Sequence, residues 1–64
     1  MEILTADEVG AMLKLSKRSV YQLTCARVRQ GQKHPLPLLR INGNLRFRKP
    51  DVEQWLQQLA EETA

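Results

Sequence analysis

The sequence predicts a mainly helical fold with one small β-hairpin, in the order helix, turn, helix, two-stranded hairpin, helix. Two observations predict it. Amphipathic stretches begin near residues 6, 17 and 50, the first two after an N-cap residue and the third with Pro50 in its first turn. The stretch "LLRINGNLRFR", residues 38–48, alternates apolar and polar residues around a turn cluster. Since the 64 residues contain no repeat or linker, we expect one domain over residues 1–64, with a small core.

The first helix is predicted within "TADEVGAMLKL", which starts at Thr5. Thr5 and Glu8 have the spacing of a capping box, in which each side chain satisfies a backbone N–H of the other residue. Val9, Met12 and Leu13 then recur on one helical face, which we expect to face the core.

A second helix is predicted from the N-cap Ser16 to an end near residues 26–30. Its inward stripe is Val20, Leu23 and Thr24. Beyond this stripe the pattern degrades, because Arg27 would fall on the buried side of a continuing helix, and Gly31 is a natural stop. Two helices joined by so short a turn form the skeleton of a helix-turn-helix.

The hairpin can take two registers. A two-residue turn, Asn42-Gly43, would mix arginine with leucine or isoleucine on each face. A three-residue loop over 42–44 instead gathers the apolar residues Leu39, Ile41, Leu45 and Phe47 on one face. The other face then carries Leu38, Arg40, Arg46 and Arg48. We therefore expect the three-residue loop, with Asn44 left-handed and an arginine face turned outward.

A loop and a last helix complete the fold. "GQKHPLP", residues 31–37, reads as a loop because its prolines force extended backbone. Pro50 suits the first turn of a helix, and acids follow it near the positive helix end. The apolar spacing of this helix is i, i+3, i+4, i+7, at Val52, Trp55, Leu56 and Leu59. Trp55 and Phe47 are expected in the core.

Charge is segregated along the chain. All ten Lys and Arg residues lie between residues 14 and 49, and the seven acids lie outside that range. A basic zone that a fold can present on one surface is typical of proteins that bind polyanions. The alternative is an ordinary solvated face.

The second helix begins with bases where the other two helices have acids. Its first turn is Ser16-Lys17-Arg18-Ser19, against the preference set by the helix dipole. A phosphate at this end would compensate. On a helical wheel Arg18, Gln22 and Arg29 lie opposite Val20, with Lys17 and Tyr21 at the flanks, and Arg and Gln are residues that read bases in a major groove.

Other chemistry is not favoured by these residues. The single Cys25 excludes an internal disulfide, and Cys25 and His34 are too few ligands for a zinc site. We expect Cys25 to be a small neutral filler and His34 to be a plain loop residue without a nearby carboxylate. There is no catalytic set, phosphate loop or other cofactor motif, and no apolar run of membrane-spanning length. We expect a non-enzymatic protein without metal or cofactor, in the reducing cytoplasm.

"LTADEVGAMLKLSKRSVYQL" followed by "LRINGNLRFRKPDVEQWL" resembles the excisionase-type, MerR-like winged helix-turn-helix domains. The family pattern is a "LT..E.A..L..S..TVY.L" helix pair, a basic wing and an "R....DVE.WL" helix. Gly10 and Ser19 stand where the pattern has Ala and Thr, and the segment between Leu23 and the wing is longer here.

The resemblance implies double-stranded DNA binding by the second helix and the wing. Carried onto this chain, the helix contacts are Lys17, Arg18, Ser19, Tyr21 and Gln22, and the wing contacts are Arg40, Arg46 and Arg48. Asn42 and Asn44 of the wing are added as candidates, with Ser16, Arg29, Lys33 and Lys49 as further phosphate contacts.

Relatives of this kind are phage or mobile-element proteins that bind cooperatively and steer a tyrosine integrase toward excision. An integrase and neighbouring copies of the chain are thus the expected partners, in a bacterial cytoplasm. The alternatives are a small transcriptional regulator of the same fold and a basic protein-interaction adaptor.

Overall fold

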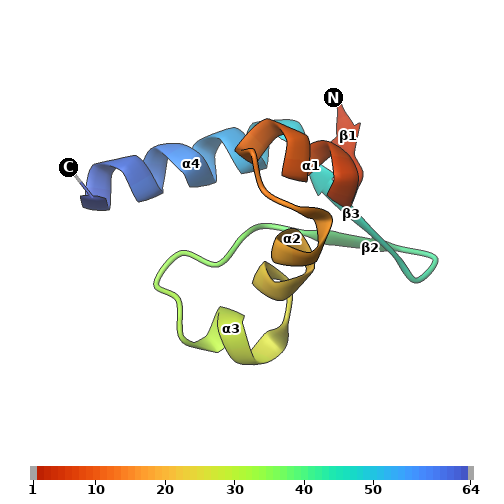
Figure 1. Ribbon diagram of the computed structural model, residues 1–64, viewed down its shortest axis with the longest axis horizontal. Coiled ribbons are helices and arrows are strands. Elements are labelled where there is room, and N and C mark those ends of the chain that lie inside the picture. The colour runs from red at the N-terminus through yellow and green to blue at the C-terminus, as the bar shows by residue number, and fades with distance from the viewer. Residues whose placement is uncertain (1, 64) are drawn as a thin grey trace.

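The computed structural model describes residues 2–63 and contains four helices and three short strands within them. In chain order these are β1 (Ile3–Leu4), α1 (Ala6–Leu13), α2 (Lys17–Leu23), α3 (Ala26–Gln30), β2 (Leu39–Ile41), β3 (Asn44–Arg48) and α4 (Lys49–Thr63). Figure 1 shows α2 and α3 below α1 and α4, while the hairpin of β2 and β3 projects to one side as a wing. Within residues 2–63 no helix is long and apolar enough to cross a membrane.

The caps of α1 and α2 form as the sequence predicts. The Thr5 hydroxyl accepts from the Glu8 N–H at 3.2 Å, and the Thr5 N–H donates to the Glu8 carboxylate at 2.9 Å. The C-cap of α1 is Lys14, whose backbone is left-handed with φ 58°. The Leu15 N–H then donates to the Gly10 carbonyl at 2.8 Å, so the turn folds closely back on α1. This turn delivers the chain to Ser16, whose hydroxyl caps α2.

The second helix is shorter than predicted, because the chain breaks at Thr24–Cys25. The Thr24 hydroxyl donates to the Tyr21 carbonyl at 2.7 Å, and Cys25 takes an extended conformation with φ −67° and ψ 133°. A separate helix, α3, then covers the residues expected to end α2. Since Arg27 on a continuing helix would be directed at the core, the break avoids burying an unpaired guanidinium.

The hairpin register predicted from the sequence is wrong. The strands are joined by the two-residue turn Asn42-Gly43, with φ 51° and 79°. The cross-strand pairs are Leu39 with Arg46, Arg40 with Leu45, and Ile41 with Asn44. Two left-handed residues give a turn whose twist matches that of the strands, and this outweighs the mixing of arginine with apolar residues on both faces. Arg40 therefore does not share a face with Arg46 and Arg48, and Asn44 is a strand residue.

A strand that the sequence did not predict, β1, pairs antiparallel with β3, so the sheet order is β1-β3-β2. Leu4 lies opposite Phe47, which places both on the face that meets the helices. Ile3 lies opposite Arg48 on the other face, where Ile41 also remains 48% exposed. The expected apolar face that included Ile41 is thus replaced by a core-facing set drawn from β1 and β3, namely Leu4, Leu45 and Phe47.

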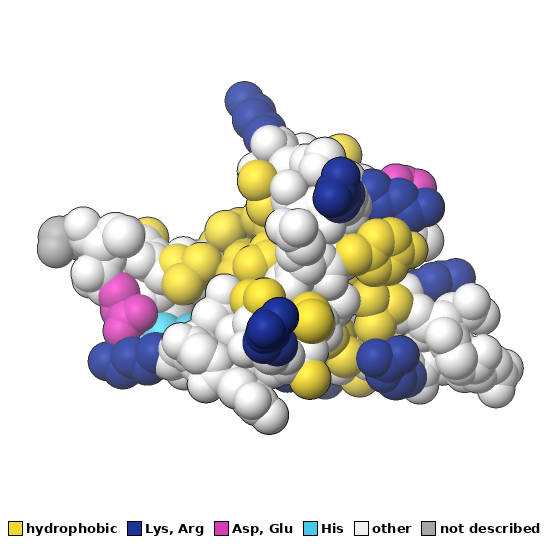
Figure 2. Space-filling model, turned by 60° about the horizontal axis from the view of Figure 1, so that its bottom comes forward, with side chains coloured by type: hydrophobic (Ala, Val, Ile, Leu, Met, Phe, Trp, Pro, Cys, Tyr) yellow, Lys and Arg dark blue, Asp and Glu magenta, His cyan; other side chains and the backbone are white. Residues whose placement is uncertain are grey.

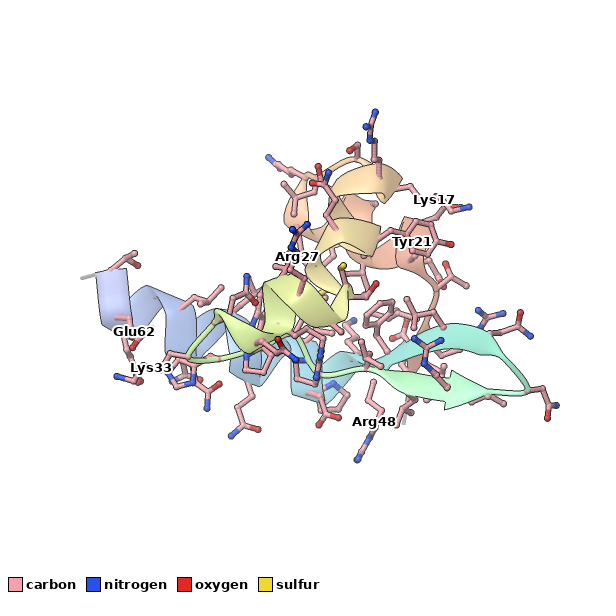
Figure 3. The ribbon with its side chains drawn as sticks, turned by 90° about the horizontal axis from the view of Figure 1, so that it is seen from below. Lys17, Tyr21, Arg27, Lys33, Arg48 and Glu62 are labelled. Atoms are coloured by element: carbon pink, nitrogen blue, oxygen red, sulfur yellow. The ribbon has the colours of Figure 1, made fainter. Side chains whose placement is uncertain are left out.

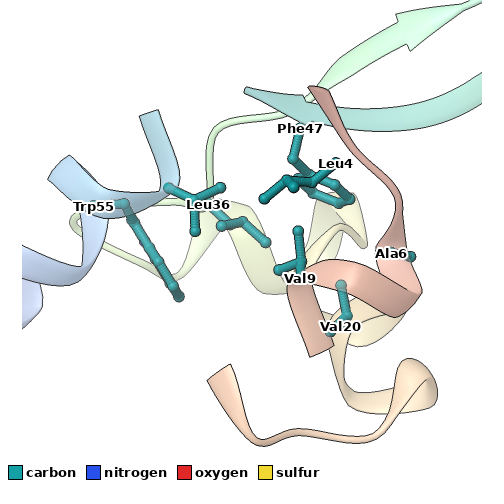
Figure 4. Packing of buried hydrophobic residues seen from close by; sticks show 8 residues of the cluster. Leu4, Ala6, Val9, Val20, Leu36, Phe47 and Trp55 are labelled. Carbon is teal, nitrogen blue, oxygen red and sulfur yellow. The ribbon is translucent and has the colours of Figure 1, made fainter. Parts of the chain in front are cut away.

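The core draws on every part of the fold except α3 and β2. Its buried members are Leu4, Ala6, Val9, Val20, Leu36, Phe47, Val52 and Trp55, as Figure 4 shows. Phe47 and Trp55 are buried, which confirms the prediction that they belong to the core. Leu36 lies in the proline-containing segment after α3, and the Trp55 indole N–H donates to the His34 carbonyl at 2.8 Å. This segment is thereby fixed to α4.

Candidate nucleic-acid interface

The exposed face of α2 carries four of the residues singled out in the sequence. Val20 is fully buried, so Arg18 and Gln22 are exposed on the opposite side of the helix, and Lys17 and Tyr21 are exposed at its flanks. Ser19 is half-buried, and its N–H donates to the Ser16 hydroxyl at 3.2 Å. Ser16 and Ser19 thus hold the first turn of α2, while the side chains of Lys17 and Arg18 project from that turn and Gln22 projects one turn later.

A groove of about 510 Å³ separates this face of α2 from the wing. Lys17 and Tyr21 line one wall, and Arg40, Asn44 and Arg46 line the other. The register puts Arg40 on the face of the wing that turns toward the helices. Five of the predicted contact residues therefore meet around one concave surface that is rich in positive charge.

Arg46 reaches the groove from the open edge of β3. In the observed register, Leu45 belongs to a non-hydrogen-bonded pair, so its carbonyl points away from β2. Strand β1 pairs only with Phe47 and Arg48 and leaves that carbonyl uncovered. The Arg46 guanidinium donates to it at 2.7 Å. Arg46 and its pair partner Leu39 start from the face of the wing that points away from the groove. The hydrogen bond to the Leu45 carbonyl nevertheless holds the Arg46 guanidinium beside the groove.

Arg48 does not join this cluster. Figure 3 shows its side chain pointing away from Lys17 and Tyr21, on the other side of the wing. Its guanidinium pairs with Asp51 at 3.5 Å, which ties the end of β3 to the first turn of α4. The three wing arginines expected on one face are therefore divided between two.

Acids from the ends of the chain fold back onto bases of the middle. Lys17 pairs with Asp7 at 3.5 Å, and its ammonium lies 5.8 Å from the centre of the Tyr21 ring. Lys49 pairs with Glu2 at 3.4 Å. Exposed pairs of this kind are worth only about 0 to 1 kcal/mol, so a phosphate can replace the acid. The basic zone is thus partly neutralised in the free protein and remains available to a polyanion.

The remaining predicted phosphate contacts lie away from the groove. The Arg29 guanidinium donates to the Leu36 carbonyl and so ties α3 to the following segment. Lys33 pairs with Glu62 at 3.0 Å near the end of α4, far from the wing in Figure 3. The hydrogen bond from Lys33, and the nearby charges of Lys33 and His34, lower the pKa of Glu62. Asn42 lies at the tip of the wing.

Two residues near α2 were missed in the sequence, and one expectation fails. Asp7 lines the groove with Lys17, and Arg27 is exposed on α3. The misfit of Arg27 on a continuing helix was the signal that could have exposed the break. His34 was expected to have no neighbouring carboxylate, but its imidazole lies 3.6 Å from Glu62. Cys25 is exposed and precedes α3.

Basic side chains are spread over the face formed by α2, α3 and the wing. Figure 2 shows Lys and Arg at separate places across this face, with hydrophobic surface between them and acids near its edges. The cations on this face are therefore dispersed and do not form one continuous patch.

A family model described as a helix-turn-helix domain matches residues 3–60 of the chain. No curated protein and no solved structure gives a match. The match begins at β1 and ends within α4, so it includes both helices of the motif and the wing. The chain belongs to the helix-turn-helix domain family.

Proposed function

We propose that the chain binds double-stranded DNA, with α2 in the major groove and the wing against the neighbouring backbone. The observation that carries this proposal is the basic first turn of α2, with Arg18 and, one turn later, Gln22 projecting from the helix and two wing arginines across the adjoining groove. Helix-turn-helix proteins insert the second helix of the motif by its N-terminal end. The bases at that end, unfavourable in the free helix, would then meet phosphate.

The exposed residues divide into two roles. Arg18 and Gln22 have the side chains that pair with guanine and adenine edges, each contributing about 1 to 3 kcal/mol of discrimination. Lys17, Arg40 and Arg46 border the groove and would contact phosphates, with Tyr21 between them. Arg29, Lys33 and Lys49 are engaged elsewhere in the fold and are not part of the proposed interface. No catalytic step belongs to this proposal.

Selection of bound sequences from a random duplex pool, followed by titration, tests the proposal. With about five phosphate contacts, the logarithm of affinity should fall with that of salt concentration at a slope of roughly −4 to −5. Arg18→Ala should flatten the sequence preference, and Arg46→Ala should weaken all sequences alike. Arg48→Ala is the matched wing control and should have the smaller effect, because Arg48 points away from α2. A slope near zero would reject the proposal.

Within DNA binding, we propose an accessory role of the excisionase type, supported by the resemblance of the helix pair, wing and last helix. So small a module covers few base pairs, which favours cooperative binding of neighbouring copies or joint binding with a tyrosine integrase in a bacterial cytoplasm. Reconstituted excision with and without the chain tests this role. A transcriptional regulator would bind the same duplex without stimulating excision. A basic adaptor for acidic proteins would show no duplex binding that survives heparin competition.

A further inference from the structure

The break after α2 reverses the exposure of Arg27. Arg27 is seven residues after Val20, so on a continuing helix the two would share one face, and Val20 is fully buried. Helix α2 instead ends at Leu23, and the Cys25 N–H donates to the Gln22 carbonyl at 3.2 Å. Helix α3 starts in a new direction, with Val28 half-buried and Arg27 exposed. The break therefore presents this guanidinium to solvent.

Helix α3 is held in place next to the proposed DNA-binding face. Its Arg29 guanidinium donates to the Leu36 carbonyl, and Leu36 itself belongs to the core. A shallow hollow of about 360 Å³ lies between α3, the end of α2 and the wing, bordered by Gln30, Thr24 and Arg40. The Arg29 hydrogen bond thus ties α3 to the segment that leads into the wing.

Arg27 lies on the same side of the molecule as the exposed residues of α2. Figure 3 places Arg27, Lys17 and Tyr21 on one side of the wing strands and Arg48 on the other. None of the ion pairs within residues 2–63 includes Arg27. The exposed Lys33, which follows α3, pairs instead with Glu62. Arg27 can therefore bind an anion without first breaking an ion pair with a carboxylate.

We propose that α3 is a third DNA-contacting element, in which Arg27 binds a backbone phosphate on the flank of the site beyond α2. This inference rests on the proposed DNA binding and enlarges its footprint. A guanidinium suits the role because it donates two parallel hydrogen bonds to phosphate oxygens. Since phosphates carry no sequence information, Arg27 adds affinity and fixes orientation while leaving base preference to α2.

The test compares Arg27→Ala with Lys33→Ala, a matched loss of one exposed base. Arg27→Ala should lower affinity for selected and random duplexes alike by about three- to tenfold, and reduce the magnitude of the salt slope by about 0.9. Ethylation interference should be lost at a phosphate flanking the site, and Arg27→Lys should retain the slope. Lys33→Ala should match the unaltered chain, and thermal melting should show that both variants fold.

The outcomes separate this inference from the function on which it rests. Unchanged affinity, slope and interference in Arg27→Ala, together with losses in Arg46→Ala, would overturn the role of α3 and leave DNA binding in place. An equal loss in Lys33→Ala would also overturn it, because the effect would then report net charge alone. Failure of the unaltered chain to bind any duplex would reject the proposed function itself.

Discussion

Replacing Gly10 by alanine tests how tightly the turn between α1 and α2 is packed. A Cβ at this position would lie 2.8 Å from the Leu15 carbonyl oxygen and 3.5 Å from Cγ2 of Val20. The first distance is shorter than a van der Waals contact, and the oxygen belongs to the backbone. Leu15 cannot easily retreat, because its own N–H donates to the Gly10 carbonyl. The turn as a whole must therefore move.

Two effects of opposite sign decide the result. Alanine is favoured over glycine inside a helix by about 1 kcal/mol, whereas overpacking a well-packed site costs about 1 to 3 kcal/mol. We expect the overpacking to prevail, with a net loss of about 1 kcal/mol and a melting temperature lower by about 4 to 8 °C for a chain of this size. DNA affinity should fall as well, since the same turn sets the angle of α2.

Urea and thermal denaturation measure the change, and Ala11→Gly calibrates it. Ala11 is exposed in the same helix, so its replacement reports the helix-propensity term almost alone. If Gly10→Ala were more stable than the unaltered chain by as much as Ala11→Gly is less stable, the close approach would carry no energy and the reasoning would be refuted.

Three further substitutions have defined outcomes. Gly43→Ala should cost about 1 kcal/mol in a urea melt, because φ is +79° and the space around it is open, leaving only backbone strain; no loss would argue against the two-residue turn. Asp7→Asn should raise affinity for every duplex about threefold in a gel shift, since it releases Lys17 and removes an acid from the groove; a decrease would give Asp7 a direct contact. Because the pKa of Glu62 is lowered in the folded chain, its stabilising effect exists above the unfolded pKa and is lost as pH falls through the folded one. Glu62→Gln should therefore lower stability at neutral pH and leave it unchanged in acid, and a difference that persists in acid would contradict the ion pair with Lys33.

Helices α1 and α4 and the start of α2 could be predicted because their signals are local. Thr5 with Glu8, and Ser16 before α2, satisfy N–H groups within three residues, so the sequence contains both partners. The apolar spacing of α4 likewise places Val52 and Trp55 in the core. These features need no knowledge of the rest of the chain.

The sheet was predicted poorly because its determinants are distant or depend on side-chain reach. Strand β1 has two residues, too few to show alternation, and exists because β3 offers an edge more than forty positions later. The register was misjudged on the assumption that each face of the hairpin must be uniform. Arg46 removes that requirement by extending around the edge of β3 to the Leu45 carbonyl.

The candidate site was predicted for α2 and only partly for the wing. Exposure of Arg18 and Gln22 follows directly from burial of Val20, as the helical wheel requires. The division of Arg40, Arg46 and Arg48 depends on the register, so that error carried over into the site. Asp7 joins the groove only because the capped start of α1 folds against α2 and the wing.

The hydrogen bond from the Trp55 indole to the His34 carbonyl links regions that have different tasks. Helix α3 leads directly into the segment that this bond fastens, so α4 helps to fix the position of α3 through that segment. If α3 contacts DNA as proposed, alterations of α4 that keep the chain folded would change how α3 meets a duplex. Binding strength would then depend on residues outside the proposed interface.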